Sequence, residues 1–263
     1  MPGRRDFLKK AGGAAVVGPM IPSVQIDRQQ RDNLPPSKYA LLVLDRSGSM
    51  NHVREATVKG VNTWLDGIRD ESDLFASIVQ FDTAGSWGLD STETFDFHAA
   101  KHLPKMTLAD YVPRGGTPLL AAVLDGIKRL EAVVRPSDKA LLVIQTDGEE
   151  NTSPPEITLE VVKNLLTAKQ AEGNWTVVFM GADIDAWESS ASVGIAPSNT
   201  LGYQNNAVAT AAAYTTTTGG TQTWSRSINA STTDFFVGVP TTSTAGASVT
   251  VKPKRTKKDT SQP

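Results

Sequence analysis

Cysteine is absent from the 263 residues of this chain, and its absence excludes several classes of protein at once. A chain without thiols has no disulfides, no thiolate zinc site, no iron–sulfur cluster and no cysteine nucleophile. The compartment stays open, because a chain that buries a large core needs no disulfides in an oxidising space. The sequence also lacks an apolar run of about 18 residues, so no conventional membrane-spanning helix is expected.

An excess of charge of one sign is missing too. The formal net charge is −2, which predicts no general attraction to nucleic acid or to an anionic membrane. Hydrophobic residues make up 39% of the chain and charged residues 21%, as in an ordinary globular protein. The length allows one sizeable α/β domain with tails.

The two ends of the chain differ in composition from the middle. The run Arg-Arg-Asp-Phe-Leu-Lys at residues 4–9 precedes a short Gly/Ala/Val stretch and resembles a twin-arginine export signal, which implies a periplasmic or extracellular protein. A disordered basic terminus on a cytoplasmic protein is the alternative, since prolines interrupt the apolar stretch. We therefore expect a signal-like segment and linker over residues 1–36 and a low-complexity basic tail over residues 234–263.

Strand-like and helix-like patterns alternate between these ends, over residues 37–233. Short apolar runs predict strands that are buried on both faces, at residues 39–44, 74–81, 140–144 and 175–180. Between these runs, apolar residues recur every three or four positions, as on the buried face of a helix. Residues 84–97 alternate apolar and polar side chains and indicate an antiparallel hairpin or edge strand. The predicted fold class is α/β, a doubly wound and mainly parallel sheet with helices on both faces and one antiparallel edge strand.

Hard oxygen donors follow the first predicted strand. Asp45, Ser47 and Ser49 stand at alternate positions, and Gly48 permits the sharp turn that would aim them at one point. Ligands of doubly wound sheets bind beyond the carboxyl ends of the strands, which is where these residues stand.

Two further oxygen donors are expected at the same edge of the sheet. Thr117 begins a strongly periodic helix, which it is also expected to cap, and Asp147 follows the strand at residues 140–144. Hydroxyl and carboxylate oxygens suit Mg²⁺, Mn²⁺ or Ca²⁺ and suit zinc or copper poorly. Capping and turn formation are the alternative explanation for such residues after a strand. Glu149 and Glu150 either tune the charge of this site or belong to a solvated loop.

Taken together, these motifs resemble the metal-ion-dependent adhesion site of von Willebrand factor A domains. The matching pieces are Asp-x-Ser-x-Ser at residues 45–49, the threonine of Gly-Gly-Thr-Pro at 115–118 and Thr-Asp-Gly at 146–148, and the resemblance covers about residues 37–230. It implies a Rossmann-like fold similar to small stand-alone bacterial members. It also implies a Mg²⁺ ion, with Mn²⁺ or Ca²⁺ as alternatives, on five ligands: Asp45, Ser47, Ser49, Thr117 and Asp147.

The same resemblance implies how the site works. Neutral hydroxyl ligands leave the charge of the cation incompletely neutralised, so an exchangeable position attracts a carboxylate from an exposed Asp or Glu of a partner protein. We therefore expect a protein-binding module with an adhesion-type role and not an enzyme. The sequence shows no evident nucleophile–base pair, no Gly-x-Ser-x-Gly and no phosphate-binding loop. A metal-dependent hydrolase, or an accessory subunit of a larger ATPase or phage assembly, are the alternatives.

Overall fold

The structure is a computed structural model that describes residues 34–85, 88–183, 186–241 and 248–251. The chain divides into two units, Met1–Pro35 and Pro36–Pro263, and all described helices and strands lie in the second. The export-signal prediction concerns residues 4–9 and lies outside the described residues, as does most of the basic tail.

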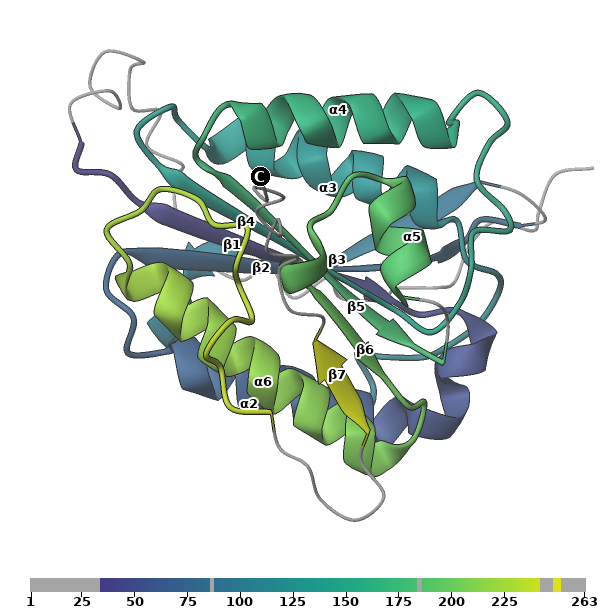
Figure 1. Cartoon of the computed structure of the whole chain (residues 1–263). Coiled ribbons are helices and arrows are strands. Elements are labelled where there is room, and N and C mark those ends of the chain that lie inside the picture. The colour runs from purple at the N-terminus through teal and green to yellow at the C-terminus, as the bar shows by residue number, and fades with distance from the viewer. Residues whose placement is uncertain (1–33, 86–87, 184–185, 242–247, 252–263) are drawn as a thin grey trace, which may run out of the picture. The chain divides into compact units, whose positions relative to one another are not determined.

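A seven-stranded sheet forms the centre of the second unit, with the strand order β3-β2-β1-β4-β5-β6-β7 (Figure 1). The strands are β1 (Lys38–Asp45), β2 (Leu74–Thr83), β3 (Leu89–Ala99), β4 (Lys139–Thr146), β5 (Trp175–Ala182), β6 (Thr200–Tyr203) and β7 (Val249–Val251). Neighbouring strands from β2 to β6 are parallel, and the edge strands β3 and β7 are antiparallel to their neighbours. The doubly wound, mainly parallel α/β fold is confirmed. β3 is the expected antiparallel edge strand, and β7 adds a second one at the opposite edge.

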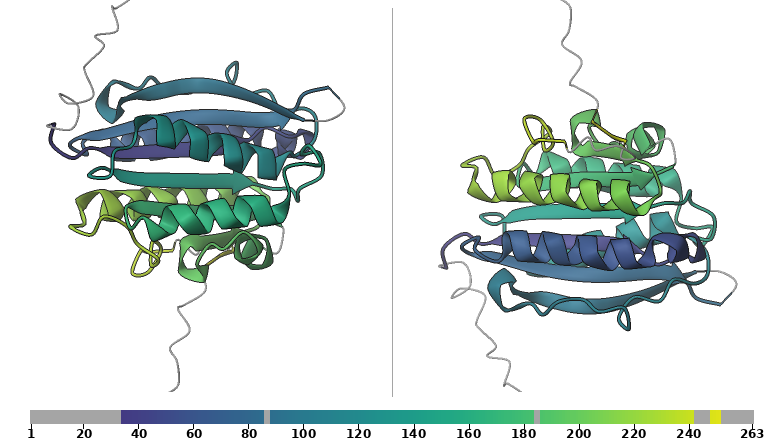
Figure 2. Two further views of the ribbon diagram at one scale, coloured as in Figure 1. Left: turned by 90° about the horizontal axis from the view of Figure 1, so that it is seen from above. Right: turned by 90° about the horizontal axis from the view of Figure 1, so that it is seen from below.

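Helices cover both faces of this sheet (Figures 1 and 2). One face carries α2 (Arg54–Ile68) and α6 (Ala207–Arg226), which lie side by side. The other face carries α3 (Leu119–Val133), α4 (Leu159–Ala171) and the short α5 (Ala186–Ser192). Three 3-10 helices complete the described elements: η1 (Gly48–Val53), η2 (Ala100–His102) and η3 (Pro197–Asn199). Within the described part of the chain, no helix is both long and apolar enough to cross a membrane.

Strand β1 shows why its sequence is continuously apolar. Leu42 and Leu44 belong to the core under α2 and α6, whereas Leu41 and Val43 belong to the core under α3 and α4. Successive side chains of a strand point to opposite faces, so a strand covered by helices on both sides needs an apolar residue at every position.

The C-terminal end of the domain lies beyond the expected boundary at residue 233. Phe235 and Phe236 are each 2% exposed and belong to the same core as α6. The three residues of β7 then pair with β6. The expectation of a tail without a core is therefore wrong for this part of the segment. Two aromatic side chains and a short β-branched strand suffice to add it to the domain, although the segment as a whole is polar.

Candidate metal site

The loop after β1 presents three of the five predicted donors. Asp45 is the last residue of β1 and is fully buried, and its Oδ1 accepts a hydrogen bond from the backbone N–H of Ser47 at 2.6 Å. Its Oδ2 accepts a second bond from Thr146 Oγ1 at 2.5 Å. Helix η1 begins immediately afterwards, and its first turn holds the hydroxyl oxygens of Ser47 and Ser49 3.0 Å apart. Asp45 is thus the anchor that folds this loop back onto the end of the strand.

Asp147 reaches the same point from the loop after β4. Its Oδ1 accepts a hydrogen bond from Ser49 Oγ at 2.7 Å, and its Oδ2 accepts one from Asn205 Nδ2 at 2.8 Å. Strands β1 and β4 are parallel neighbours, so the residues that follow them emerge at the same edge of the sheet. The structure therefore joins Ser47, Ser49 and Asp147 in one chain of hydrogen bonds.

Thr117 lies against the loop that carries Asp147 and is 3% exposed. A Cβ atom on Gly148 would lie 2.9 Å from Thr117 Oγ1, so the loop approaches this hydroxyl at a distance that a side chain would obstruct. Asn151 holds the backbone of Thr117 from both sides, because its Oδ1 accepts from Thr117 N–H at 2.8 Å and its own N–H donates to the Thr117 carbonyl at 3.1 Å. No hydrogen bond of Thr117 Oγ1 is formed within the described residues.

The prediction that Thr117 caps α3 is wrong, because other side chains bind the first N–H groups of this helix. Glu150 Oε2 accepts from Leu120 N–H at 2.7 Å, and Ser153 Oγ accepts from Ala121 N–H at 3.0 Å. Glu150 also accepts from the hydroxyl of Ser153 at 2.6 Å. Glu150 is therefore neither a free charge beside the site nor a solvated loop residue. Its capping role leaves the hydroxyl of Thr117 available to the site.

Two arginines fix the loops relative to each other. The guanidinium of Arg46 donates hydrogen bonds to both carboxylate oxygens of the fully buried Asp82, at 3.2 and 3.1 Å. Arg114 Nε donates to the same carboxylate at 2.7 Å. The backbone N–H of Arg114 also donates to the carbonyl of Arg46 at 2.8 Å. The loop that carries Ser47 and the loop that carries Thr117 are thus tied together by charge-assisted hydrogen bonds.

Burial raises the pKa of Asp45 to about 6, and the nearby charge of Asp147 adds to the rise. Hydrogen bonds from Thr146 and Ser47 favour the ionised form and oppose the rise in this pKa. A buried carboxylate with a raised pKa lacks compensating positive charge, which a cation at this point would supply.

The donor set fits a hard, Mg²⁺-sized cation. Within the described residues there is no group of three or more His, Cys, Asp or Glu side chains, so the site depends on hydroxyls as well as carboxylates. Ligands at 2.0–2.1 Å in an octahedron lie about 2.9 Å from their neighbours. The oxygen pairs Ser47–Ser49 and Ser49–Asp147, at 3.0 and 2.7 Å, bracket that spacing.

Two residues of the site escaped the sequence analysis. Asn205 comes from the loop between β6 and α6, and no local pattern marks a residue so distant in the chain from Asp147. His52 closely follows the motif at residues 45–49, but an isolated histidine in the sequence does not indicate a role in the site. Its Nδ1 lies 2.7 Å from the carbonyl oxygen of Ser49 and its Nε2 lies 3.0 Å from that of Asn205. His52 therefore bridges the first metal loop and the β6–α6 loop.

No protein-family model and no curated protein matches the sequence. Solved structures do match it in fold. The pilus adhesin SpaC from Lactobacillus rhamnosus GG, in its open conformation, has 17% identity and a TM-score of 0.53 over 69% of this chain and 29% of its own. Proximal thread matrix protein 1 from the mussel byssus has 17% identity and a TM-score of 0.50 over 68% of this chain and 46% of its own. A von Willebrand factor type A protein from Catenulispora acidiphila has 15% identity and a TM-score of 0.48, over 68% of this chain and 41% of its own.

The fold is of the von Willebrand factor A type, as the sequence motifs predict. The strand order, the antiparallel edge strand β3 and the helices on both faces all agree with this fold. This chain spans less than half the length of each of the three proteins described above.

Proposed function

We propose that this domain binds a partner protein by capturing an Asp or Glu carboxylate through a divalent cation. The cation would be held by the five predicted residues: Asp45, Ser47, Ser49, Thr117 and Asp147. The observation that carries the proposal is the hydrogen-bonded convergence of Ser47, Ser49 and Asp147 beside the hydroxyl of Thr117. Mg²⁺ at this point would supply an electrophilic position for an incoming carboxylate oxygen.

The protein residues divide the work of such a site. The three hydroxyls offer neutral oxygens, which keep the site attractive to an anion. Both oxygens of Asp45 already accept hydrogen bonds from the protein, so besides helping to hold the cation it orients the loop and provides negative charge behind the hydroxyls. Asn205 holds Asp147 by one oxygen and leaves the other beside Ser49.

The surroundings of the site favour binding over catalysis. Both ring nitrogens of His52 lie against backbone carbonyl oxygens, so neither is placed to remove a proton from a substrate. Glu150 is committed to the start of α3 through Leu120. We therefore propose a binding module without hydrolase activity.

We also propose that the protein works outside the cytoplasm. The support is the twin-arginine-like run at residues 4–9 and the fold shared with a pilus adhesin. Cell fractionation with and without Arg4→Lys/Arg5→Lys tests this location, and a protein that stays in the cytoplasm in both cases contradicts it.

Unfolding measurements in EDTA, Mg²⁺, Mn²⁺ and Ca²⁺ test the metal site. If the dissociation constant for Mg²⁺ is about 1 mM, then 10 mM stabilises the domain by roughly 1.4 kcal/mol, a shift of about 2–4 °C in the unfolding midpoint. Ser49→Ala removes one exposed donor hydroxyl and should abolish this shift. Ser72→Ala removes an exposed hydroxyl just before β2, at the edge of the sheet opposite to the candidate site, and should preserve the shift. The absence of a shift with every cation, confirmed by calorimetry, would contradict the proposal.

A further inference from the structure

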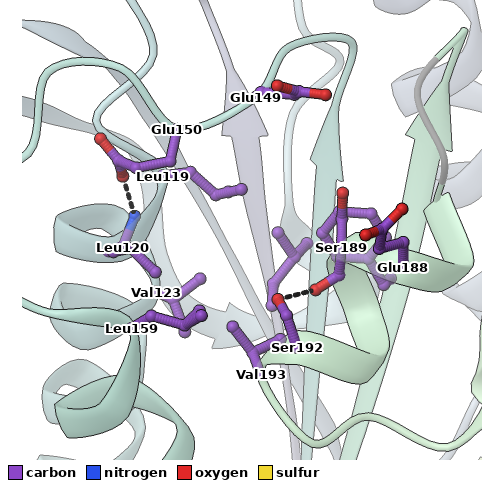
Figure 3. A pocket seen from close by; sticks show the side chains of 12 residues that line it. Leu119, Leu120, Val123, Glu149, Glu150, Leu159, Glu188, Ser189, Ser192 and Val193 are labelled. Carbon is purple, nitrogen blue, oxygen red and sulfur yellow. Dashed lines mark hydrogen bonds between the residues drawn. The ribbon is translucent and has the colours of Figure 1, made fainter.

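An open groove lies beside the candidate metal site, on the face of the sheet covered by α3, α4 and α5 (Figure 3). Its volume is about 460 Å³, within the range of about 300–1,000 Å³ that is usual for ligand pockets. Aliphatic side chains from α3 and from the residue that follows α5 form its floor, among them Leu120, Val123 and Val193. Leu159, the first residue of α4, lines the groove and is 44% exposed. The groove therefore offers an apolar surface that the fold leaves uncovered.

The rim of the groove is acidic. Figure 3 shows Glu149, Glu150 and Glu188 around the apolar floor, and none of the described lining residues is basic. Glu150 is held in place by its bond to Leu120 N–H, whereas Glu149 is exposed at the rim. Carboxylates around a low-dielectric floor favour a cationic group on an incoming chain and disfavour an anionic one.

The groove begins where the metal loops end. Leu119 stands two residues after Thr117, and Glu149 stands two residues after Asp147. An extended peptide advances about 3.3 Å per residue, so a chain whose carboxylate is bound at the site would reach the groove within a few residues.

We propose that this groove receives the same partner segment that supplies the carboxylate. That segment would carry an apolar side chain next to a Lys or Arg, within about six residues of its Asp or Glu. The inference rests on the proposed function and adds the sequence chemistry of the partner. The apolar floor selects the apolar side chain, and the acidic rim selects the Lys or Arg. The continuity of the groove with both metal loops sets the distance of these two residues from the Asp or Glu.

A panel of twelve-residue fluorescent peptides tests the inference with the full chain. Each peptide is built of Gly and Ser and carries one aspartate, with a Leu–Lys pair one to six residues away on either side. Anisotropy is measured in Mg²⁺ and in EDTA. At the best separation we expect binding at least about tenfold tighter than that of the same peptide with Ser–Ser in place of Leu–Lys, a difference of about 1.4 kcal/mol.

Two groove variants and two matched controls locate the effect. Glu149→Lys and Leu159→Asp should reduce the advantage of the Leu–Lys pair to less than about twofold. Glu160→Lys and Val161→Asp alter exposed residues of α4 that do not line the groove, and should preserve the advantage. The Mg²⁺-dependent binding of the aspartate-only peptide should survive in all four variants, which separates loss of the groove from loss of the metal site.

Three results would overturn the inference. If the affinity of the peptides depends on the aspartate alone, the groove does not bind the partner segment, and the proposed function stays intact. A Leu–Lys advantage that persists in EDTA would show a groove that binds independently of the metal. Tighter binding after Arg4→Glu/Arg5→Glu would mean that the basic N-terminal segment of this chain, and not a partner, occupies the groove.

Discussion

Helices α2 and α6 approach each other closely on one face of the sheet, whereas α3, α4 and α5 leave a groove of about 460 Å³ on the other. The close pair has the weaker sequence pattern, since α6 consists largely of Ala, Thr and Gly. The open face carries the more regular stripe of aliphatic residues, on α3. A hydrophobic stripe therefore shows which side of a helix faces inward, but the size of the residues at the contact decides how closely helices pack.

The two faces also differ in polarity. The α2/α6 side contains buried hydroxyls without a hydrogen-bond partner in the described structure, including those of Thr57 and Tyr214. Trp64 Nε1 is paired there, with Thr221 Oγ1 at 3.0 Å. Unpaired buried hydroxyls cost free energy, so dense packing has to offset them on this face. Among the described residues, the helices α3 and α4 contribute no buried hydroxyl that lacks a hydrogen-bond partner.

The largest expected effect concerns Asp45, at the end of the strand that both faces share. Its pKa is about 6 in the folded, metal-free domain and 3.8 ordinarily, so the folded state binds more protons between these values. Stability without metal therefore falls as the pH rises from about 4 to about 6, by up to about 3 kcal/mol. Asp45→Asn keeps an acceptor oxygen for the backbone N–H of Ser47 and removes the charge. Its amide N–H can donate to Thr146 Oγ1, whose own proton then goes to the carbonyl of Gly148. At pH 7 in EDTA the variant should be more stable than the wild type by up to that amount.

Urea unfolding in EDTA at pH 4 and pH 7 checks this expectation, and the difference between the two proteins should vanish at the lower pH. The same variant should lose the response to Mg²⁺. A less stable Asp45→Asn protein at pH 7 would mean that other groups already compensate the buried charge.

A pair of glycine substitutions tests the comparison of the two faces directly. A Cβ on Gly60 of α2 would lie 2.2 Å from the buried ring of Tyr214 on α6, whereas a Cβ on Gly126 of α3 would lie 2.8 Å from a methyl group of Val43. Gly60→Ala should cost about 1–3 kcal/mol, because the ring has no room to move. Gly126→Ala should cost less than about 1 kcal/mol, since the gain in helix propensity offsets a smaller clash. The reverse order in urea unfolding would refute the difference in packing.

The smallest expected effect concerns the open face. Leu159→Asp should change the free energy of unfolding by less than about 0.5 kcal/mol, because Leu159 is 44% exposed and an acidic residue suits the first turn of α4. The same denaturation assay measures it. A decrease of more than about 1 kcal/mol in the free energy of unfolding would show that Leu159 belongs to the core. The groove would then not be a surface free to bind a partner.

The central strands could be predicted to within a few residues, because a strand buried on both faces needs an unbroken apolar run. β7 could not be predicted. Its three residues are stabilised as a strand by pairing with β6, and Phe235 and Phe236 gain their burial from α6 and its neighbours. Neither contact leaves a periodic signal in a polar segment.

The candidate site divides in the same way. Asp45, Ser47, Ser49 and Asp147 could be placed together in advance, because the ends of adjacent parallel strands meet at one edge of the sheet. Asn205 could not be placed, because it reaches Asp147 from a loop that is remote in the chain.

The sequence by itself determined the layered α/β fold, the positions of the oxygen donors and their convergence at one edge, since these follow from periodicity and from neighbours in the chain. Only the tertiary structure decided that Glu150 and Ser153 would cap α3, which leaves the hydroxyl of Thr117 available to the site. It also decided the raised pKa of Asp45 and the opening of the acidic groove. These properties depend on which distant segments exclude water from a group or leave space beside it, and no local pattern of residues encodes that.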